Sequence, residues 1–325
     1  MYQDRLSLLK NIENRRRSRV ILYVSGDRPG LETKIQEDVY DYFAEILEQF
    51  GDVNRISLIL YSRGGDTLTA WALVNLIKQY CKRFEVILPA RAFGAGTLIT
   101  LGADRIVMAK QAALGCIDTS VNTPLNPTAD EQSQPRTLPV SMETINGYLD
   151  FALSQIGEHE PNILKDLILR LSEQVHPLVL GKAYQSASQV QAIAARLLES
   201  SGLEDNKIES IVSLLCAEPG SHDYVVHRSE ATAMGLPVEK PHESMYSDIK
   251  ALYTDVAGEL GLNQPWHPAT ELEDQEYQRF SHKRCLLEST AGKAWSFLTE
   301  GEIVRHDQNV QENRTFEGWR PESAD

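Results

Sequence analysis

The chain has 325 residues, of which 42% are hydrophobic and 24% are charged, and its formal net charge is −14. This composition is that of a globular protein long enough for one large α/β domain or for one domain with a helical appendage. The acidic balance disfavours a nucleic-acid ligand, because binding to phosphates depends on clustered Lys and Arg.

Two further classes of protein are disfavoured by the order of the residues. No segment approaches the roughly 18 consecutive apolar residues of a membrane span, and the charges scattered through residues 1–19 are not those of a secretory signal. We therefore expect a cytoplasmic protein without a membrane span. The cysteines are widely spaced and form no C-x-x-C pair, so we expect four free thiols and no metal site. We also expect no cofactor.

The N-terminal third of the chain alternates between two kinds of pattern. Helical periodicity predicts helices over 2–16, 35–50 and 67–81, and branched apolar runs predict strands over 18–25, 55–62 and 84–90. A short helix over 98–102 and a strand over 105–108 follow. Near-continuous apolar strands separated by helices indicate a parallel sheet that is covered on both faces.

The rest of the chain is punctuated by residues 122–140, which are rich in Pro, Asn, Gln and Thr and predict an exposed loop. Helical periodicity dominates from about 141 to 216, and a further helix is expected near 244–260. From about 264 the sequence is polar with isolated tryptophans, and we predict no regular element there outside 291–298. The expected organisation is a core whose N-terminal part is 1–121, a loop over 122–140, a helical remainder over 141–263 and a tail over 264–325.

Two glycine-bearing loops follow predicted strands, where α/β sheets place their ligand sites. Gly64 and Gly65 lie between the strand at 55–62 and the helix at 67–81. Consecutive glycines allow backbone N–H groups to converge and hold an oxyanion or a phosphate, although a plain tight turn explains the pair equally well.

The second loop, Ala92–Thr97, follows the strand at 84–90. The first residue of such an elbow would point over the site, where the charge of a nucleophile is stabilised. That residue here is Gly94, and no hydroxyl or thiol occupies the elbow. A need for small residues between helix and strand also explains this loop.

In combination, the loops and several downstream segments resemble the serine dehydrogenase proteinase family, part of the Clp-protease-like group that includes signal peptide peptidase A. The likeness covers roughly residues 5–240 and rests on the segments Ser62–Gly65, Phe93–Leu98, Leu101–Met108, Leu114–Asp118, His176–Gly181, Ser221–Tyr224 and Glu230–Leu236. The resemblance implies an α/β fold with a Clp-protease/crotonase-like core of parallel sheet and helices and a C-terminal helical extension. It also implies a homo-oligomer.

The same resemblance implies a peptidase site. Gly64, Gly65 and Ala95 would supply oxyanion and substrate-binding N–H groups, and a serine in a Ser-Ala-Gly-Thr elbow would attack the amide. Aligning Ala95-Gly96-Thr97 with that elbow places the serine at Gly94, where the chain departs from the family.

No general base carries over from the family. A related branch uses a lysine further along the chain, and the nearest match here is Val140. All eight histidines lie from His159 onward. His222 is next to Asp223, which could orient it as a base, but a surface or helix-capping role accounts for this histidine as well. Thr97 and Ser62 are the substitute nucleophiles, and no base is indicated for either.

We therefore predict a peptidase-fold protein that has lost amide hydrolysis at Gly94 and that binds a peptide or a partner protein in its cleft. An assembly or regulatory subunit that binds partners through the cleft is a further hypothesis, which coincides with this one if activity is absent. One alternative is an active, ATP-independent serine-type peptidase whose nucleophile is unidentified or whose serine was substituted. A second is a crotonase-like acyl-CoA enzyme, since that group shares the fold and uses backbone N–H pairs as an oxyanion hole.

Overall fold

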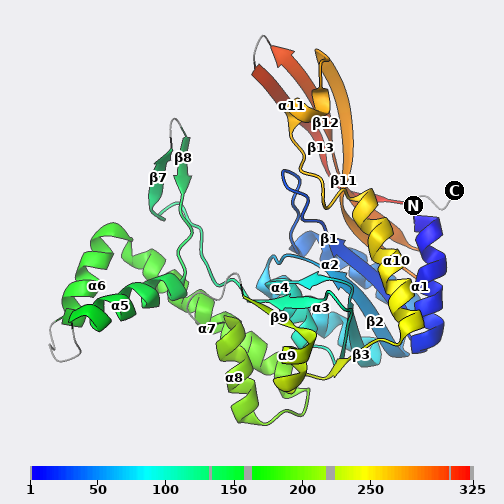
Figure 1. The fold of residues 1–325 in the computed structure, drawn as a ribbon, viewed down its shortest axis with the longest axis horizontal. Coiled ribbons are helices and arrows are strands. Elements are labelled where there is room, and N and C mark those ends of the chain that lie inside the picture. The colour runs from blue at the N-terminus through cyan, green and yellow to red at the C-terminus, as the bar shows by residue number, and fades with distance from the viewer. Residues whose placement is uncertain (1, 132–133, 157–162, 217–223, 307–308, 323–325) are drawn as a thin grey trace. The chain divides into compact units, whose positions relative to one another are not determined.

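The computed structural model describes residues 2–131, 134–156, 163–216, 224–306 and 309–322. The chain forms two compact units, which are described separately. The first combines Met1–Leu114 with Val226–Asp325, and the second is Gly115–Val225. Figure 1 shows the helices and strands of both.

The first unit is built on an eight-stranded sheet with the order β10-β5-β3-β2-β1-β11-β12-β13. Its parallel part consists of β1 (Arg19–Ser25), β2 (Val53–Tyr61), β3 (Cys81–Leu88), β5 (Arg105–Met108) and β10 (Val238–Glu239). The carboxyl-terminal halves of β2 and β3 and nearly all of β1 are buried without interruption, as strands covered on both faces are. The predicted α/β class is confirmed, with a large and mostly parallel central sheet.

The helices of the first unit follow the predicted pattern closely. They are α1 (Tyr2–Arg16), α2 (Tyr40–Phe50), α3 (Thr67–Gln79), α4 (Ala95–Leu101), α9 (Arg228–Ala233), α10 (Glu243–Glu259) and α11 (Pro268–Leu272). The helix predicted over 35–50 starts later, after a 3₁₀ turn at Glu37–Val39, because Ile35 pairs with Gly65 in a parallel bridge. Two short strands, β4 (Arg91–Ala92) and β6 (Ala113–Gly115), pair in parallel.

The prediction that residues 264–325 lack regular structure outside 291–298 is wrong. Three long strands, β11 (Tyr277–Ser289), β12 (Ala294–His306) and β13 (Asn309–Pro321), extend the sheet in antiparallel fashion from β1. Register shifts at Lys283/Cys285 and at Glu300/Gly301 interrupt the alternation of side chains between the two faces. These bulges break the period of two by which a strand is recognised in a sequence.

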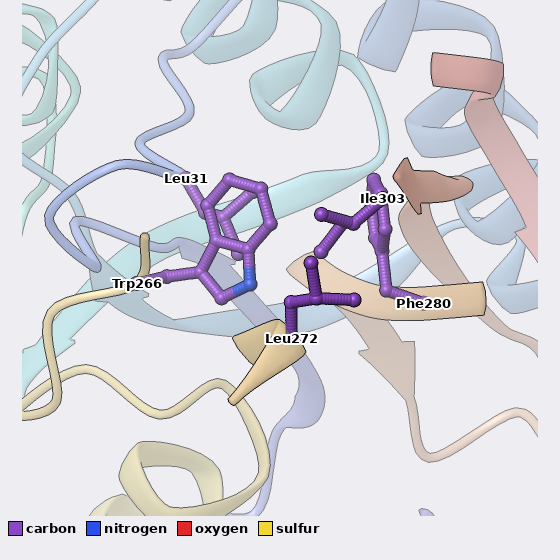
Figure 2. Packing of buried hydrophobic residues seen from close by; sticks show 5 residues of the cluster. All are labelled: Leu31, Trp266, Leu272, Phe280 and Ile303. Carbon is purple, nitrogen blue, oxygen red and sulfur yellow. The ribbon is translucent and has the colours of Figure 1, made fainter. Parts of the chain in front are cut away.

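The tryptophans of this C-terminal segment pack within the first unit. Trp266 is 3% exposed and lies in a cluster with Leu31, Leu272, Phe280 and Ile303 (Figure 2). Its ring centroid is 5.4 Å from that of Phe280. These contacts bury apolar surface from strands β11 and β12 against the loop that follows β1, and so join the tail to the core.

A charged network at the amino ends of the parallel strands gives the fold a predictable dependence on pH. Arg16 donates to Glu239 Oε1 at 2.7 Å and also bonds Glu85, and Arg105 donates to Glu239 Oε2 at 2.8 Å. Burial by itself raises the pKa of Glu239, but the hydrogen bonds and charges of Arg16 and Arg105 outweigh it and lower the pKa below its ordinary value of 4.5.

We expect the Glu239 carboxylate to stabilise the fold above pH 4.5 and to lose this effect as the pH falls through its lowered pKa. Urea unfolding midpoints measured from neutral pH down to about pH 3 should therefore fall less steeply below pH 4.5 in Glu239→Gln than in the parent. Glu243→Gln is the control, since the Glu243 side chain is 75% exposed. Identical pH profiles for the parent and Glu239→Gln would contradict the prediction.

The second unit is mainly helical, as predicted for 141–216. It contains α5 (Met142–Ile156), α6 (Ile163–Gln174), α7 (Pro177–Glu199) and α8 (Asp205–Cys216). Residues 122–140, predicted as a loop, include a hairpin of β7 (Thr128–Glu131) and β8 (Gln134–Thr137). Asn126 is buried there, and its side-chain amide donates hydrogen bonds to the carbonyls of Val121 and Leu138, at 2.8 Å each. The chain returns to the first unit through β9 (Val225–His227).

Two predictions from composition can be compared with the described residues. All four cysteines are free, and burial raises the pKa of Cys81 to about 11 and that of Cys216 to about 12. Both thiols are therefore protonated at neutral pH. In the described part of the chain, no helix is both long and apolar enough to cross a bilayer.

Candidate functional site

The two glycine loops lie side by side at the carboxyl-terminal edge of the parallel sheet. The loop after β2 and the segment after β3 form a parallel bridge between Ser62 and Ala92. The Ser62 N–H donates to the Arg91 carbonyl at 3.1 Å, and the Phe93 N–H donates to the Ser62 carbonyl at 2.9 Å. Backbone hydrogen bonds thus bring together two loops that are about thirty residues apart, as the parallel arrangement of β2 and β3 requires.

Both glycines have a backbone conformation that favours glycine, and at Gly65 a close approach of the backbone leaves no room for a side chain. Gly64 and Gly65 have φ angles of 121° and 147°. Ile35 N donates to Gly64 O at 2.9 Å, and Asp66 N donates to Ile35 O at 2.8 Å. A Cβ on Gly65 would lie 2.2 Å from Ile35 O, so no larger residue fits without a backbone shift.

Gly94 has the backbone conformation of a strained strand-to-helix elbow. Its φ is 55° and its ψ is −120°, and it directly precedes α4. A Cβ built on Gly94 would lie 3.1 Å from Gly64 Cα and 3.8 Å from Arg63 O, so a side chain here would be aimed at the diglycine loop. A sharp turn of this kind between strand and helix presents the nucleophile in many hydrolases. In this chain the position carries no side chain at all.

The hydrogen-bond donors of the two loops are not equivalent. The Gly64 N–H is directed into the protein and donates to Ser62 Oγ at 3.0 Å. The N–H groups of Gly65 and Ala95, by contrast, find no acceptor among the residues that the structure describes. The backbone donor without an acceptor is thus Gly65 in one loop and Ala95 in the other, and not Gly64; Gly65 is partly exposed, whereas Ala95 is fully buried.

The two hydroxyls that could replace the nucleophile are both in the interior. Thr97 is fully buried, and its hydroxyl donates to the Ala92 carbonyl at 2.8 Å. Ser62 is also fully buried; its hydroxyl accepts a hydrogen bond from the Ser25 hydroxyl at 2.6 Å and donates to the Gly64 carbonyl at 3.3 Å. Both hydroxyls hold the loops in place, and neither has a solvent-facing surface from which to attack a substrate.

The two positions that the sequence analysis considered for a general base were His222 and Val140. His222 lies outside the described part of the chain. Val140, the nearest match to the family's lysine, exchanges two backbone hydrogen bonds with Val121 in the apolar cluster of the second unit. Across the described ranges, no group of three or more His, Cys, Asp or Glu side chains is arranged to hold a metal ion.

The same edge carries a charged cluster that sequence reasoning missed. Asp27 Oδ1 accepts a hydrogen bond from the Tyr61 hydroxyl at 2.7 Å. Its second oxygen, Oδ2, lies 3.2 Å from Arg91 Nη1 and 3.8 Å from Arg63 Nε. Burial raises the pKa of Tyr61 well above its ordinary value, and the hydrogen bond to Asp27 adds to this, so the phenol remains a donor. The position of Asp27 just after β1 was the available signal, because the carboxyl ends of parallel strands share one edge.

A nearby cavity is distinct from the glycine loops. Its volume is about 670 Å³, and it is lined by Gln36, Glu37, Tyr40, Asp41, Asp66, Leu68, Thr69 and Ala72. It therefore starts one residue beyond Gly65 and includes none of the residues predicted for the site. Its three carboxylates also make it a poor place for an oxyanion.

Comparison with known proteins bears on the first part of the chain. The family described as ClpP-like SDH-type serine proteinase matches residues 1–144. Two curated relatives are the uncharacterized proteins MJ0137 and MJ1495 of Methanocaldococcus jannaschii. The first is 26% identical over 72% of this chain and 73% of its own length, and the second is 22% identical over 78% of each.

Solved structures with a likeness to the chain include two proteases. A mutant of the 1510-N membrane-bound stomatin-specific protease has a TM-score of 0.38 and 17% identity, over 66% of this chain and 79% of that one. ClpP1 from Listeria monocytogenes has a TM-score of 0.36 and 12% identity, over 73% of this chain and 99% of that one. The resemblance inferred from the two glycine loops is confirmed by the family match: residues 1–144 are similar to the ClpP-like SDH-type serine proteinases.

Proposed function

We propose that this protein keeps the carbonyl-binding part of a serine-peptidase site and uses it to bind a peptide or a partner protein without cutting it. The observation that carries the proposal is Gly94, which has the conformation of a nucleophile elbow but no side chain. Gly65 and Ala95 each contribute a backbone N–H without an acceptor among the described residues, which suits them to hold a peptide carbonyl.

Amide hydrolysis needs a nucleophile with a base within hydrogen-bond reach. The two nearby hydroxyls, Ser62 and Thr97, are buried and donate to backbone carbonyls of the protein. In serine peptidases, an oxyanion hole and substrate binding without the catalytic residues leave only a small residual rate. Retained binding with lost cleavage is therefore the function that these loops support best.

A fluorophosphonate probe and unfolded casein test the proposal. We expect neither labelling nor cleavage by the parent, and slow labelling of Gly94→Ser at the new hydroxyl. Gly94→Ala is the matched control, because it introduces the same Cβ at 3.1 Å from Gly64 Cα without a hydroxyl. The melting temperatures of the two variants should agree, which separates a misfolded elbow from an inactive one.

Labelling or casein cleavage by the parent would overturn the proposal in favour of an active peptidase with another nucleophile. Failure of casein-derived peptides to bind the parent in a fluorescence anisotropy titration would overturn it as well. The acyl-CoA alternative is tested by calorimetry with acetyl-CoA, and measurable heat of binding would favour that enzyme class instead.

A further inference from the structure

We propose that Arg63 and Arg91 form a carboxylate-binding subsite beside the carbonyl-binding pair, so that the peptide held there carries a carboxylate next to its bound carbonyl. The carboxylate belongs either to an acidic side chain or to a free C-terminus. This inference rests on the proposed function and specifies its ligand.

Both arginines belong to the loops that carry the carbonyl-binding N–H groups. Arg63 directly precedes Gly64, and the Arg91 carbonyl accepts the Ser62 N–H at 3.1 Å. Successive residues of a peptide are about 3.8 Å apart. A peptide whose carbonyl is bound at Gly65 and Ala95 would therefore bring its neighbouring residues within reach of the two guanidinium groups.

The charges of the cluster do not balance. Asp27 contributes one negative charge, and its two oxygens are occupied: Oδ1 by the Tyr61 hydroxyl, and Oδ2 by Arg91 at 3.2 Å and Arg63 at 3.8 Å. Two guanidinium groups thus share one carboxylate oxygen. This leaves a surplus positive charge in a protein whose net charge is −14.

Each arginine contacts the buried Asp27 side chain, and more than half of its own side chain is exposed to solvent. The Asp27 side chain is 5% exposed, whereas the side chains of Arg63 and Arg91 are 58% and 52% exposed. Tyr61, which fixes Asp27, packs against Tyr253 with ring centroids 5.6 Å apart. A guanidinium has five N–H donors, and the contact of each arginine with Asp27 uses one nitrogen, so donors remain for a bidentate carboxylate.

Anisotropy titrations with fluorescein-labelled, tiled casein peptides test the subsite. Each acidic peptide is compared with its Asn/Gln counterpart, and each free C-terminus with its amide, so that the two comparisons separate the sources of the carboxylate. We expect the charged member of at least one pair to bind about three- to tenfold tighter at low salt. The difference should shrink at about 0.5 M NaCl.

The variants are Arg63→Gln, Arg91→Gln and, as the matched control, Arg105→Gln. Arg105 is a similarly exposed arginine that pairs with one carboxylate, Glu239, at the start of β5 and so at the opposite edge of the sheet. The ratio of the affinities of the charged and the neutral peptide should fall toward unity in Arg63→Gln and Arg91→Gln. It should be unchanged in Arg105→Gln. Arg63→Gln leaves the closer Arg91–Asp27 pair intact, so it remains informative if Arg91→Gln does not fold.

Equal affinity of charged and neutral peptides would overturn the subsite and leave the proposed function standing. A preference for charged peptides that survives in both Arg63→Gln and Arg91→Gln would also overturn it. Absence of binding by every peptide would overturn the proposed function together with the subsite.

Discussion

Replacing Arg5 with methionine is expected to destabilise the folded chain by about 3–5 kcal/mol. The Arg5 side chain is completely buried between α1, α10 and β11. Its Nε lies 3.1 Å and 3.0 Å from the two carboxylate oxygens of the equally buried Glu288, and its Nη1 lies 2.5 Å from Asp255 Oδ2. It also bonds Glu259. Removing the cation leaves the Glu288 carboxylate buried without its main partner.

Urea unfolding at neutral pH measures this effect against a control on the same helix. Arg15 pairs with Asp248 but is 44% exposed, so Arg15→Met should cost no more than about 1 kcal/mol. Burial raises the pKa of Glu288 even beside Arg5, and the double variant Arg5→Met with Glu288→Met should therefore recover part of the lost stability. Equal losses in Arg5→Met and Arg15→Met would show that burial of the network is not what stabilises it.

Gly65→Ala is expected to destabilise the chain by about 3 kcal/mol or more, and to abolish peptide binding in whatever fraction folds. Two costs combine. The φ of 147° is unfavourable for a residue with a Cβ, and the added carbon would lie 2.2 Å from Ile35 O and 2.4 Å from Ile35 N. Relief requires the loop to move away from Ile35, which displaces the Gly65 N–H from the site.

Gly51→Ala separates these two costs. Gly51 also has a positive φ, 61°, but a Cβ there would meet nothing within 4 Å. Its replacement should therefore cost only about 1 kcal/mol, from the backbone conformation alone. Thermal unfolding of the two variants gives the comparison. A loss in Gly65→Ala no larger than that in Gly51→Ala would refute the steric argument.

The core of the fold was predictable because its signal is local. Strands β1, β2 and β3 are buried along most of their length, so each reads as an unbroken apolar run. The helices between them have one buried face and read as a helical period. The parts of the fold that were not predicted depend on pairing between segments far apart in the sequence. Ile35 bonds to the diglycine loop instead of starting a helix. The bulged strands β11–β13 form their hydrogen bonds with β1 and with one another.

The candidate site divides in the same way. The sequence alone determines that Gly64 and Gly65 precede the helix that became α3, and its resemblance to the family predicts that Gly94 stands in the place of the serine, because these are matters of residue identity and spacing. Only the tertiary structure decides what those residues do. It turns the Gly64 N–H toward Ser62, leaves the N–H groups of Gly65 and Ala95 without an acceptor among the described residues, and gathers Arg63 and Arg91 around Asp27. The physical reason is that direction and contact depend on where parallel strands end in space, and residues from three separate strand ends meet at that edge.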